Sequence, residues 1–139
     1  MSSEEDRVNN LVAEIRMLES AYGDIAQRQN FLERMLVDSR TAVETIKGIA
    51  AASSEDVLIP VGAGVLLRSA PPKVDKVLVN IGANVMVEKT RDEATSFMEA
   101  RGKELEQSLV SLVSQRNQVG QRLESDRRAL QSYINRQGQ

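Results

Sequence analysis

The chain has 139 residues, a formal net charge of −2 and 3% aromatic residues, while 27% of its residues are charged. This length gives room for one domain, and so few aromatic side chains favour an elongated molecule packed by Leu, Ile and Val. The near-neutral charge gives no electrostatic reason to bind nucleic acid or an anionic membrane, so we expect neither as a partner.

The sequence lacks two residue types that carry much of protein chemistry. It has no Cys, which excludes disulfides, and no His, the commonest general base and metal ligand. The acidic start, residues 2–6, is unlike a signal peptide, and the longest nearly apolar run, residues 57–67, is well short of the roughly 20 residues that span a bilayer. We therefore expect a cytoplasmic protein that is not an enzyme, holds no metal and needs no cofactor.

The first third of the chain, residues 1–53, is predicted to form one long helix. Ser2 and Glu5 have the spacing of a capping box, in which each side chain satisfies a free backbone N–H. A heptad seam follows, and eleven of its thirteen positions are apolar. The seam positions are Val8, Leu11, Ile15, Leu18, Tyr22, Ile25, Gln29, Leu32, Leu36, Ser39, Val43, Ile46 and Ala50. A stripe this narrow and regular is typical of a coiled coil.

The middle of the chain, residues 54–88, contains an internal repeat. Residues 57–67 (VLIPVGAGVLL) return as residues 77–87 (VLVNIGANVMV), with five of eleven positions identical and four more exchanging one aliphatic side chain for another. Each copy predicts a β-hairpin, because Gly-Ala-Gly and Gly-Ala-Asn tolerate the positive φ of a tight turn. The glycines of residues 62–64 do not indicate a phosphate-binding loop, since a third glycine and a following helix are missing.

These hairpins are apolar on both faces and have open edges. We expect them to join hairpins of other chains in a closed intersubunit β-barrel, which removes the edges. The residues expected to carry oligomerisation are Val57, Ile59, Val61, Val65, Leu67, Val77, Val79, Ile81, Val85 and Val87.

The last third, residues 89–139, predicts a second long helix. Thr90 and Glu93 form another capping box. Eight of twelve seam places are apolar: Met98, Leu105, Leu109, Leu112, Val119, Leu123, Leu130 and Tyr133; the others are Thr95, Gly102, Arg116 and Asp126. Two seams of equal length predict an antiparallel coiled coil, in which Gln29 lies level with Arg116 and Tyr22 with Gly120. The expected fold is therefore mainly α, a single domain (residues 1–139) in which the coiled coil carries two central hairpins.

The far ends of the two helices contain the candidate binding site. Helix ends fray, and apolar side chains exposed at mobile ends usually mark a binding surface. The candidate residues are Val8, Leu11, Val12, Ile15, Leu130, Tyr133 and Ile134. A basic cluster nearby, Arg122, Arg127, Arg128 and Arg136, is interleaved with acidic residues. That interleaving predicts a solvated face rather than a nucleic-acid site.

A heptad helix, a doubled Gly-Ala hairpin and a returning heptad helix together resemble the prefoldin family, in particular its archaeal-type alpha subunits. The resemblance is most specific across residues 59–64 (IPVGAG) and 77–85 (VLVNIGANV). It implies a hexamer of two alpha and four beta subunits that holds unfolded client proteins at its tips without ATP and delivers them to a group II chaperonin. It implies no residue-matched client site. The alternative function is a structural scaffold or tether that binds one folded partner.

Overall fold

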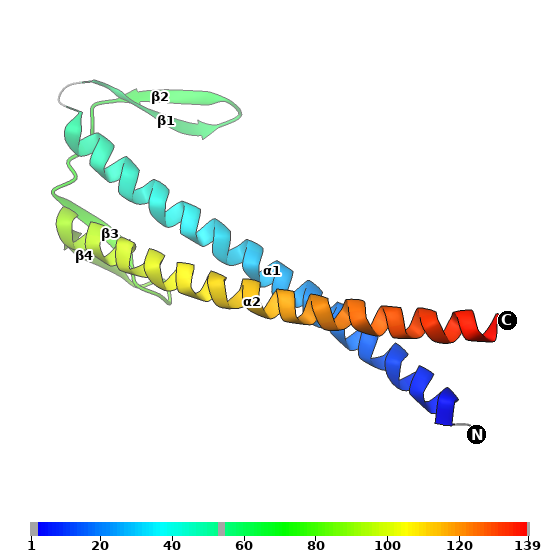
Figure 1. The fold of residues 1–139 in the computed structure, drawn as a ribbon. Helices are drawn as coiled ribbons and strands as arrows, with labels where there is room; N and C mark the ends of the chain where they lie inside the picture. Colours follow the sequence, from blue (N-terminus) through cyan, green and yellow to red (C-terminus); the bar gives the residue numbers. More distant parts are fainter. Residues whose placement is uncertain (1–2, 53–54, 139) are drawn as a thin grey trace. The chain divides into compact units, whose positions relative to one another are not determined.

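The computed structural model describes residues 3–52 and 55–138 and contains two long helices and two β-hairpins. Helix α1 spans Ser3–Ala51 and helix α2 spans Arg91–Gln137 (Figure 1). Between them lie the strands β1 (Val57–Gly62), β2 (Val65–Ser69), β3 (Lys76–Asn80) and β4 (Met86–Thr90). The mainly α fold with two central hairpins is confirmed. Ser2 of the first predicted capping box lies outside the described residues.

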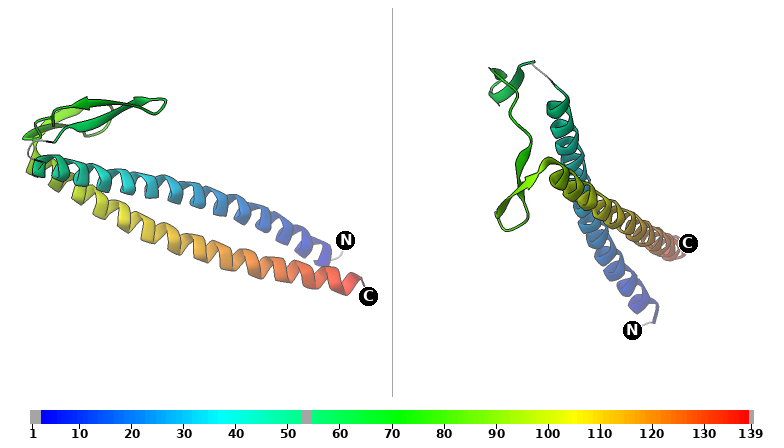
Figure 2. Two further views of the ribbon diagram at one scale, coloured as in Figure 1. Left: turned by 90° about the horizontal axis from the view of Figure 1, so that it is seen from above. Right: turned by 90° about the vertical axis from the view of Figure 1, so that its left-hand side faces the viewer.

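The first of two compact units combines Met1–Arg34 with Leu105–Gln139. Here α1 and α2 run antiparallel (Figure 2), and Arg116 Nη1 donates a hydrogen bond of 2.9 Å to Gln29 Oε1. A Cβ built on Gly120 would lie 3.6 Å from Tyr22 Cε2, which is an ordinary contact, so packing does not require glycine there. Both predicted pairings, Gln29 with Arg116 and Tyr22 with Gly120, are confirmed.

The predicted seams are the buried faces of the helices. All seam positions except Tyr22 and Ala50 are buried or half-buried, including the polar ones. In the first unit, the buried apolar side chains are Ile15, Leu105, Leu112 and Leu123. In the second unit, Met35–Glu104, they are Leu36, Val43, Val79 and Ala94. The heptad frame therefore identifies the packed face of each helix.

The second unit contains the start of α2, where the predicted capping box is confirmed. The Glu93 N–H donates to Thr90 Oγ1 at 3.2 Å, and the Thr90 N–H donates to Glu93 Oε2 at 3.4 Å. Because Thr90 is also the last residue of β4, these two bonds end the strand and begin the helix at one residue.

The four strands form two separate antiparallel sheets of two strands each, β1–β2 and β3–β4 (Figure 1). Pro60 pairs with Leu66, and Asn80 pairs with Met86, so the two hairpins share one register at an offset of twenty residues. Their turns match as well. The φ angles are 112°, 51° and 76° at residues 62–64, and 122°, 50° and 60° at residues 82–84. The internal duplication is confirmed down to the backbone of the turns.

Loss of the capping box should destabilise α2. We expect Thr90→Ala to lower the free energy of unfolding by about 1 kcal/mol, because it leaves the Glu93 N–H without its acceptor. The matched control is Thr90→Ser, which keeps the hydroxyl and should retain most of the stability. Urea unfolding at fixed protein concentration, followed by circular dichroism at 222 nm, measures both. Equal losses in the two variants would contradict the role of the hydroxyl.

Candidate functional site

The start of α1 and the end of α2 share an open hollow of about 330 Å³. Four of the seven candidate residues line it: Val8, Leu130, Tyr133 and Ile134. The Ile134 side chain is 55% exposed, whereas the other three are half-buried. Polar side chains that the sequence argument did not single out complete the wall: Glu5, Asn9 and Gln137. The hollow thus has a mixed lining, in which four candidate residues offer apolar contact to a side chain that arrives from water.

The three remaining candidate residues lie on α1 away from this hollow. Leu11 and Val12 are half-buried, and Ile15 is only 8% exposed. Ile15 is therefore part of the packed seam of the first unit in this chain. Apolar residues near a helix end occur both in the core and on the surface, so the sequence alone does not show that Ile15 belongs to the core.

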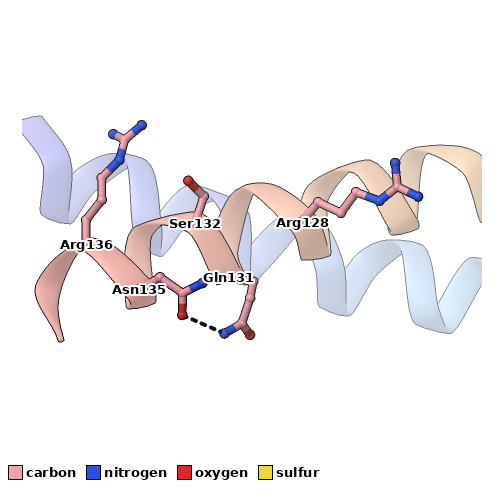
Figure 3. A pocket seen from close by; sticks show the side chains of 5 residues that line it. All are labelled: Arg128, Gln131, Ser132, Asn135 and Arg136. Atoms are coloured by element: carbon pink, nitrogen blue, oxygen red, sulfur yellow. Dashed lines mark hydrogen bonds between the residues drawn. The ribbon is translucent and has the colours of Figure 1, made fainter. Parts of the chain in front are cut away.

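A second, polar hollow of about 390 Å³ lies along the last turns of α2. Figure 3 shows its five lining side chains, which are Arg128, Gln131, Ser132, Asn135 and Arg136. Arg128, Ser132 and Arg136 extend on one side of the helix, while Gln131 Nε2 donates to Asn135 Oδ1 at 3.1 Å on the other (Figure 3). The end of α2 therefore presents a hydrogen-bonding surface in addition to its apolar one.

Most of the predicted basic cluster is paired with carboxylates. Arg122 Nε lies 2.7 Å from Glu14 Oε1, and Arg127 Nη2 lies 3.0 Å from Glu19 Oε1, so both pairs join α2 to α1. A third pair, Arg128 Nη2 with Glu124 Oε1 at 2.6 Å, lies along α2 itself. This arrangement agrees with a solvated, ion-paired face. Because these side chains are between 38% and 78% exposed, water screens the charges and each pair adds little stability.

Asp126 is a buried acid on the seam of α2. It is 4% exposed, its Oδ2 atom has no hydrogen-bond partner among the described residues, and its Oδ1 lies 3.4 Å from Arg122 Nε. Burial raises the pKa of this carboxyl, the charge of Glu14 raises it further, and Arg122 partly opposes both. The pKa of Glu14 is lowered instead, chiefly by its hydrogen bond from Arg122. The sequence analysis identified Asp126 only as a position where the apolar seam of the second helix is interrupted.

The hairpins expose most of the residues predicted to carry oligomerisation. Those between 44% and 54% exposed are Ile59, Val61, Val65, Leu67, Ile81 and Val85. Val57, Val77 and Val87 are half-buried, and Val79 is 8% exposed. Four further exposed apolar residues were missed: Leu58, Leu66, Leu78 and Met86. They alternate along the strands with the predicted residues and so lie on the opposite faces. Because successive side chains of a strand point to opposite faces, the sequence pattern could have identified them.

The two hairpins differ in how much of their surface the chain itself covers. On β3–β4, Val79 pairs with Val87, and this face is buried or half-buried. On β1–β2, the equivalent pair, Ile59 with Leu67, is exposed. The first hairpin thus leaves both apolar faces without cover, and the second leaves one. Such contiguous apolar surface is unusual for a chain that stays alone.

None of the helices in residues 3–52 and 55–138 has a stretch long and apolar enough to cross a membrane. Over the same residues, no three acidic side chains come together as they would around a metal ion.

The comparisons with known proteins identify a family. The family model described as "Prefoldin subunit" matches residues 5–136. "Prefoldin subunit alpha" of Methanococcoides burtonii is 34% identical and covers 89% of this chain and 90% of its own length. The protein of the same name from Nitrosopumilus maritimus is 30% identical, over 86% of this chain and 83% of its own. A cryo-EM structure of filamentous PFD from Methanocaldococcus jannaschii has the same fold, with a TM-score of 0.57 at 24% identity, over 87% of this chain and 95% of that one.

Asp126 generates a prediction about pH. Because its folded-state pKa lies above its ordinary value of 3.8, the wild-type chain loses stability as the pH rises from that value through the folded-state pKa. The variant Asp126→Asn carries no charge there, so it should be more stable than wild type at pH 7. The difference should vanish at about pH 3, where the wild-type carboxyl is protonated as well.

Urea unfolding at the two pH values, followed by circular dichroism, measures this difference. Asp24→Asn is the matched control, because it removes an exposed acid from α1. A stability gain that is the same at both pH values, or that Asp24→Asn reproduces, would contradict the role given to burial of Asp126.

Proposed function

The chain belongs to the prefoldin family of chaperone subunits, and from this premise we propose that it holds unfolded polypeptides at its helix ends without ATP and delivers them to a group II chaperonin. It assembles with other prefoldin subunits, as two alpha and four beta chains in a hexamer. This chain takes the alpha position. The two hairpins, β1–β2 and β3–β4, serve assembly, and the helices α1 and α2 reach the client. The role needs no catalytic group or cofactor, and we assign it to the cytoplasm.

One observation carries the client-binding role. Apolar side chains of Val8, Leu130, Tyr133 and Ile134 come together from two helices around an open hollow. A holder of many unfolded chains needs adaptable apolar contact without sequence readout, and this hollow offers that contact. Leu11 and Val12 extend the apolar surface along α1, while Ile15 becomes available only where the helix pair opens.

The contacts at one helix end are weak individually. Burying one aliphatic side chain contributes about 1.5–3 kcal/mol, and only a few such residues are accessible here. Holding a client therefore depends on several subunits that bind it at once, and avidity multiplies a weak single-site affinity by about 10² or more. Weak single contacts also let a chaperonin remove the client one contact at a time, which explains why no ATP is needed.

Assembly depends on the exposed hairpins. Apolar residues on both faces of β1–β2 and on one face of β3–β4 are about half exposed. The isolated chain thus has a large apolar surface in contact with water, which is unfavourable. A closed β-barrel shared among subunits covers these faces and leaves no free edges. The filamentous relative carries the same fold, which agrees with assembly through shared elements of this kind.

The second candidate function is a tether that binds one folded partner, and the polar hollow at Arg128, Ser132 and Arg136 favours it. A tether would recognise one partner through fixed hydrogen bonds. Ser132→Ala should then abolish binding of that partner, and the wild-type chain should not protect unrelated unfolding proteins from aggregation. Capture of several unrelated clients, insensitive to Ser132→Ala, supports the holding function instead.

Removal of the helix ends should reduce client capture without preventing assembly. The truncated chain lacks the residues up to Val12 and those beyond Arg128. It should still form complexes with its partner subunit, because both hairpins remain. Suppression of client aggregation by complexes of verified size should fall severalfold. If truncated and full-length complexes protect clients equally, the binding site lies elsewhere.

A single substitution tests the same site more sharply. Ile134→Ser should weaken capture of an unfolded client about fivefold, the equivalent of roughly 1 kcal/mol of lost apolar contact. Val110→Ser is the matched control, since Val110 is also an exposed aliphatic residue of α2, at 72% compared with 55% for Ile134. Fluorescence titration of assembled complexes with a reduced, unfolded client measures both. Equal losses of capture in the two variants would show that client binding does not depend on the position of the exposed aliphatic residue, and would contradict a site at the helix ends.

Charges placed on the hairpins should prevent assembly. Val65→Asp combined with Val85→Asp buries two carboxylates in the proposed barrel, which costs several kcal/mol when they are unpaired. Light scattering should find no full-size complex, while circular dichroism should find most of the helix retained. The control is Val110→Asp, which adds an acid to an exposed valine of α2 and should assemble normally. A full-size complex from the double variant would overturn the role of the hairpins.

A further inference from the structure

The packed seam of the first unit ends at a layer that contains an acid. Among the residues that the structure describes, Ile15 is the first buried side chain along α1, and Asp126 is the last along α2. Every described residue before Ile15 on α1, and every one after Asp126 on α2, is half-buried or exposed. The tight packing of the two helices therefore stops at these two residues.

Ile15 and Asp126 lie at about the same height in this unit. The structure places Gly120 against Tyr22. Ile15 is one heptad before Tyr22, while Asp126 is six residues after Gly120, so in antiparallel helices both steps lead to one level. Glu14 agrees with this placement, because its charge reaches across from α1 and raises the pKa of the Asp126 carboxyl.

The carboxyl of Asp126 is poorly compensated in this layer. It is 4% exposed, and its Oδ2 atom has no hydrogen-bond partner among the described residues. The nearby cation is Arg122, whose Nε lies 3.4 Å from Asp126 Oδ1 but only 2.7 Å from Glu14 Oε1. One guanidinium thus serves two carboxylates, and it lies closer to the one on α1. A buried carboxylate with an unpaired oxygen and a shared cation destabilises the packing around it.

The other polar layer of this unit is better satisfied. Arg116 donates to Gln29 Oε1 at 2.9 Å, and the Gln29 amide nitrogen in turn donates to Glu33 Oε1 at 3.0 Å. Both ends of that amide are therefore bonded. The layer of Asp126 is the weaker of the two, and it lies between the packed seam and the hollow at the helix ends.

Separation of the helices as far as this layer would uncover apolar surface. Ile15 is 8% exposed in the closed pair, and Leu11 and Val12 are half-buried. The same separation brings the Asp126 carboxylate into water, which offsets part of the cost of exposing those side chains. The uncovered stretch of α1 would continue directly from Val8, which lines the hollow.

We propose that Asp126 is a positioning residue that keeps the last layer of the seam easy to open, so that Leu11 and Ile15 become accessible to an unfolded polypeptide. The inference rests on the proposed function. It goes further by naming the buried residues that join the client site and the side chain that releases them. The helix pair gives up stability at Asp126, and the client site gains apolar surface that the closed pair hides.

Three substitutions separate the charge of Asp126 from its size. Asp126→Leu continues the apolar seam, Asp126→Asn keeps the shape but removes the charge, and Asp126→Glu keeps the charge. Asp24→Asn is the matched control, because it removes an exposed acid from α1. Each variant is assembled with a prefoldin beta subunit, and complexes of verified size are titrated with a reduced, unfolded client by fluorescence.

Asp126→Leu should weaken client capture about fivefold and Asp126→Asn about twofold, because the apparent affinity scales with the fraction of helix pairs that are open. Both should also raise the urea midpoint at pH 7. Asp126→Glu should stay within about 1.5-fold of wild type, since it keeps a carboxylate in the layer, and Asp24→Asn should match wild type. A merely structural role would make stability and capture fall together, so opposite changes identify a positioning role.

Amide hydrogen exchange measures the opening itself in the assembled complexes. Asp126→Leu should slow exchange about tenfold over residues 8–18 and leave residues 25–34 unchanged. If leucine shifts the register of the pair, Asp126→Asn carries the test, because it differs from wild type by one charge. Capture equal to or better than that of wild type, or unchanged exchange over residues 8–18, would overturn the inference. A wild-type complex that captures no unfolded client would refute the proposed function instead.

Discussion

Burial of one narrow apolar stripe on each long helix is the constraint on which the rest of this structure depends. Neither α1 nor α2 has another apolar face broad enough to build a core, so each must lay its seam against a partner helix. The polar pair Gln29 and Arg116 lies inside that seam and is joined by a 2.9 Å hydrogen bond. Any shift of register would separate Arg116 from the Gln29 oxygen and leave the half-buried guanidinium without this acceptor, so the pair favours one alignment at some cost in stability.

The same constraint leaves both faces of the first hairpin and one face of the second without cover. A helix whose seam is occupied by another helix has no apolar face left for β1–β2, which accordingly exposes residues such as Leu58 and Ile59 on opposite faces. Two-stranded sheets are marginal alone in water and become stable when further strands or helices cover them. Oligomerisation thus follows from how the helices use their apolar surface, and not from a separate recognition motif.

Much of this could be predicted from the sequence because it is local or periodic. The heptad seams, the capping box at Thr90 and the duplicated turns at residues 62–64 and 82–84 each depend on spacing within a short segment, and each was confirmed. The division between core and surface near the helix ends was not predictable in this way. Ile15 is buried and Ile134 is exposed, although both are isoleucines close to a helix end.

Tertiary contacts decide the remaining points. Val79 and Ile59 occupy equivalent places in the repeat, yet the chain covers the first and leaves the second exposed. Nothing in the repeated motif distinguishes them, because the difference arises from what lies next to each hairpin. Asp126 similarly looked like a simple break in the seam, while its raised pKa depends on burial and on Glu14 of the other helix. At the helix ends, four of the seven candidate residues line one hollow, while Leu11, Val12 and Ile15 do not, and the sequence pattern does not separate the two groups.

The amounts of exposed apolar surface at the two proposed binding regions suit different lifetimes of contact. The hairpins expose ten large apolar residues within residues 58–86, all at least 44% accessible, and covering them in an assembly would yield a stable interface. At the helix ends, Ile134 is the candidate residue exposed to that extent, while Val8, Leu130 and Tyr133 are already half-buried. A client that binds there gains little from any one chain. Stable assembly through the hairpins and reversible client binding at the helix ends, as proposed above, can therefore both arise from the hydrophobic effect. The two differ because more apolar area is left uncovered on the hairpins than at the helix ends.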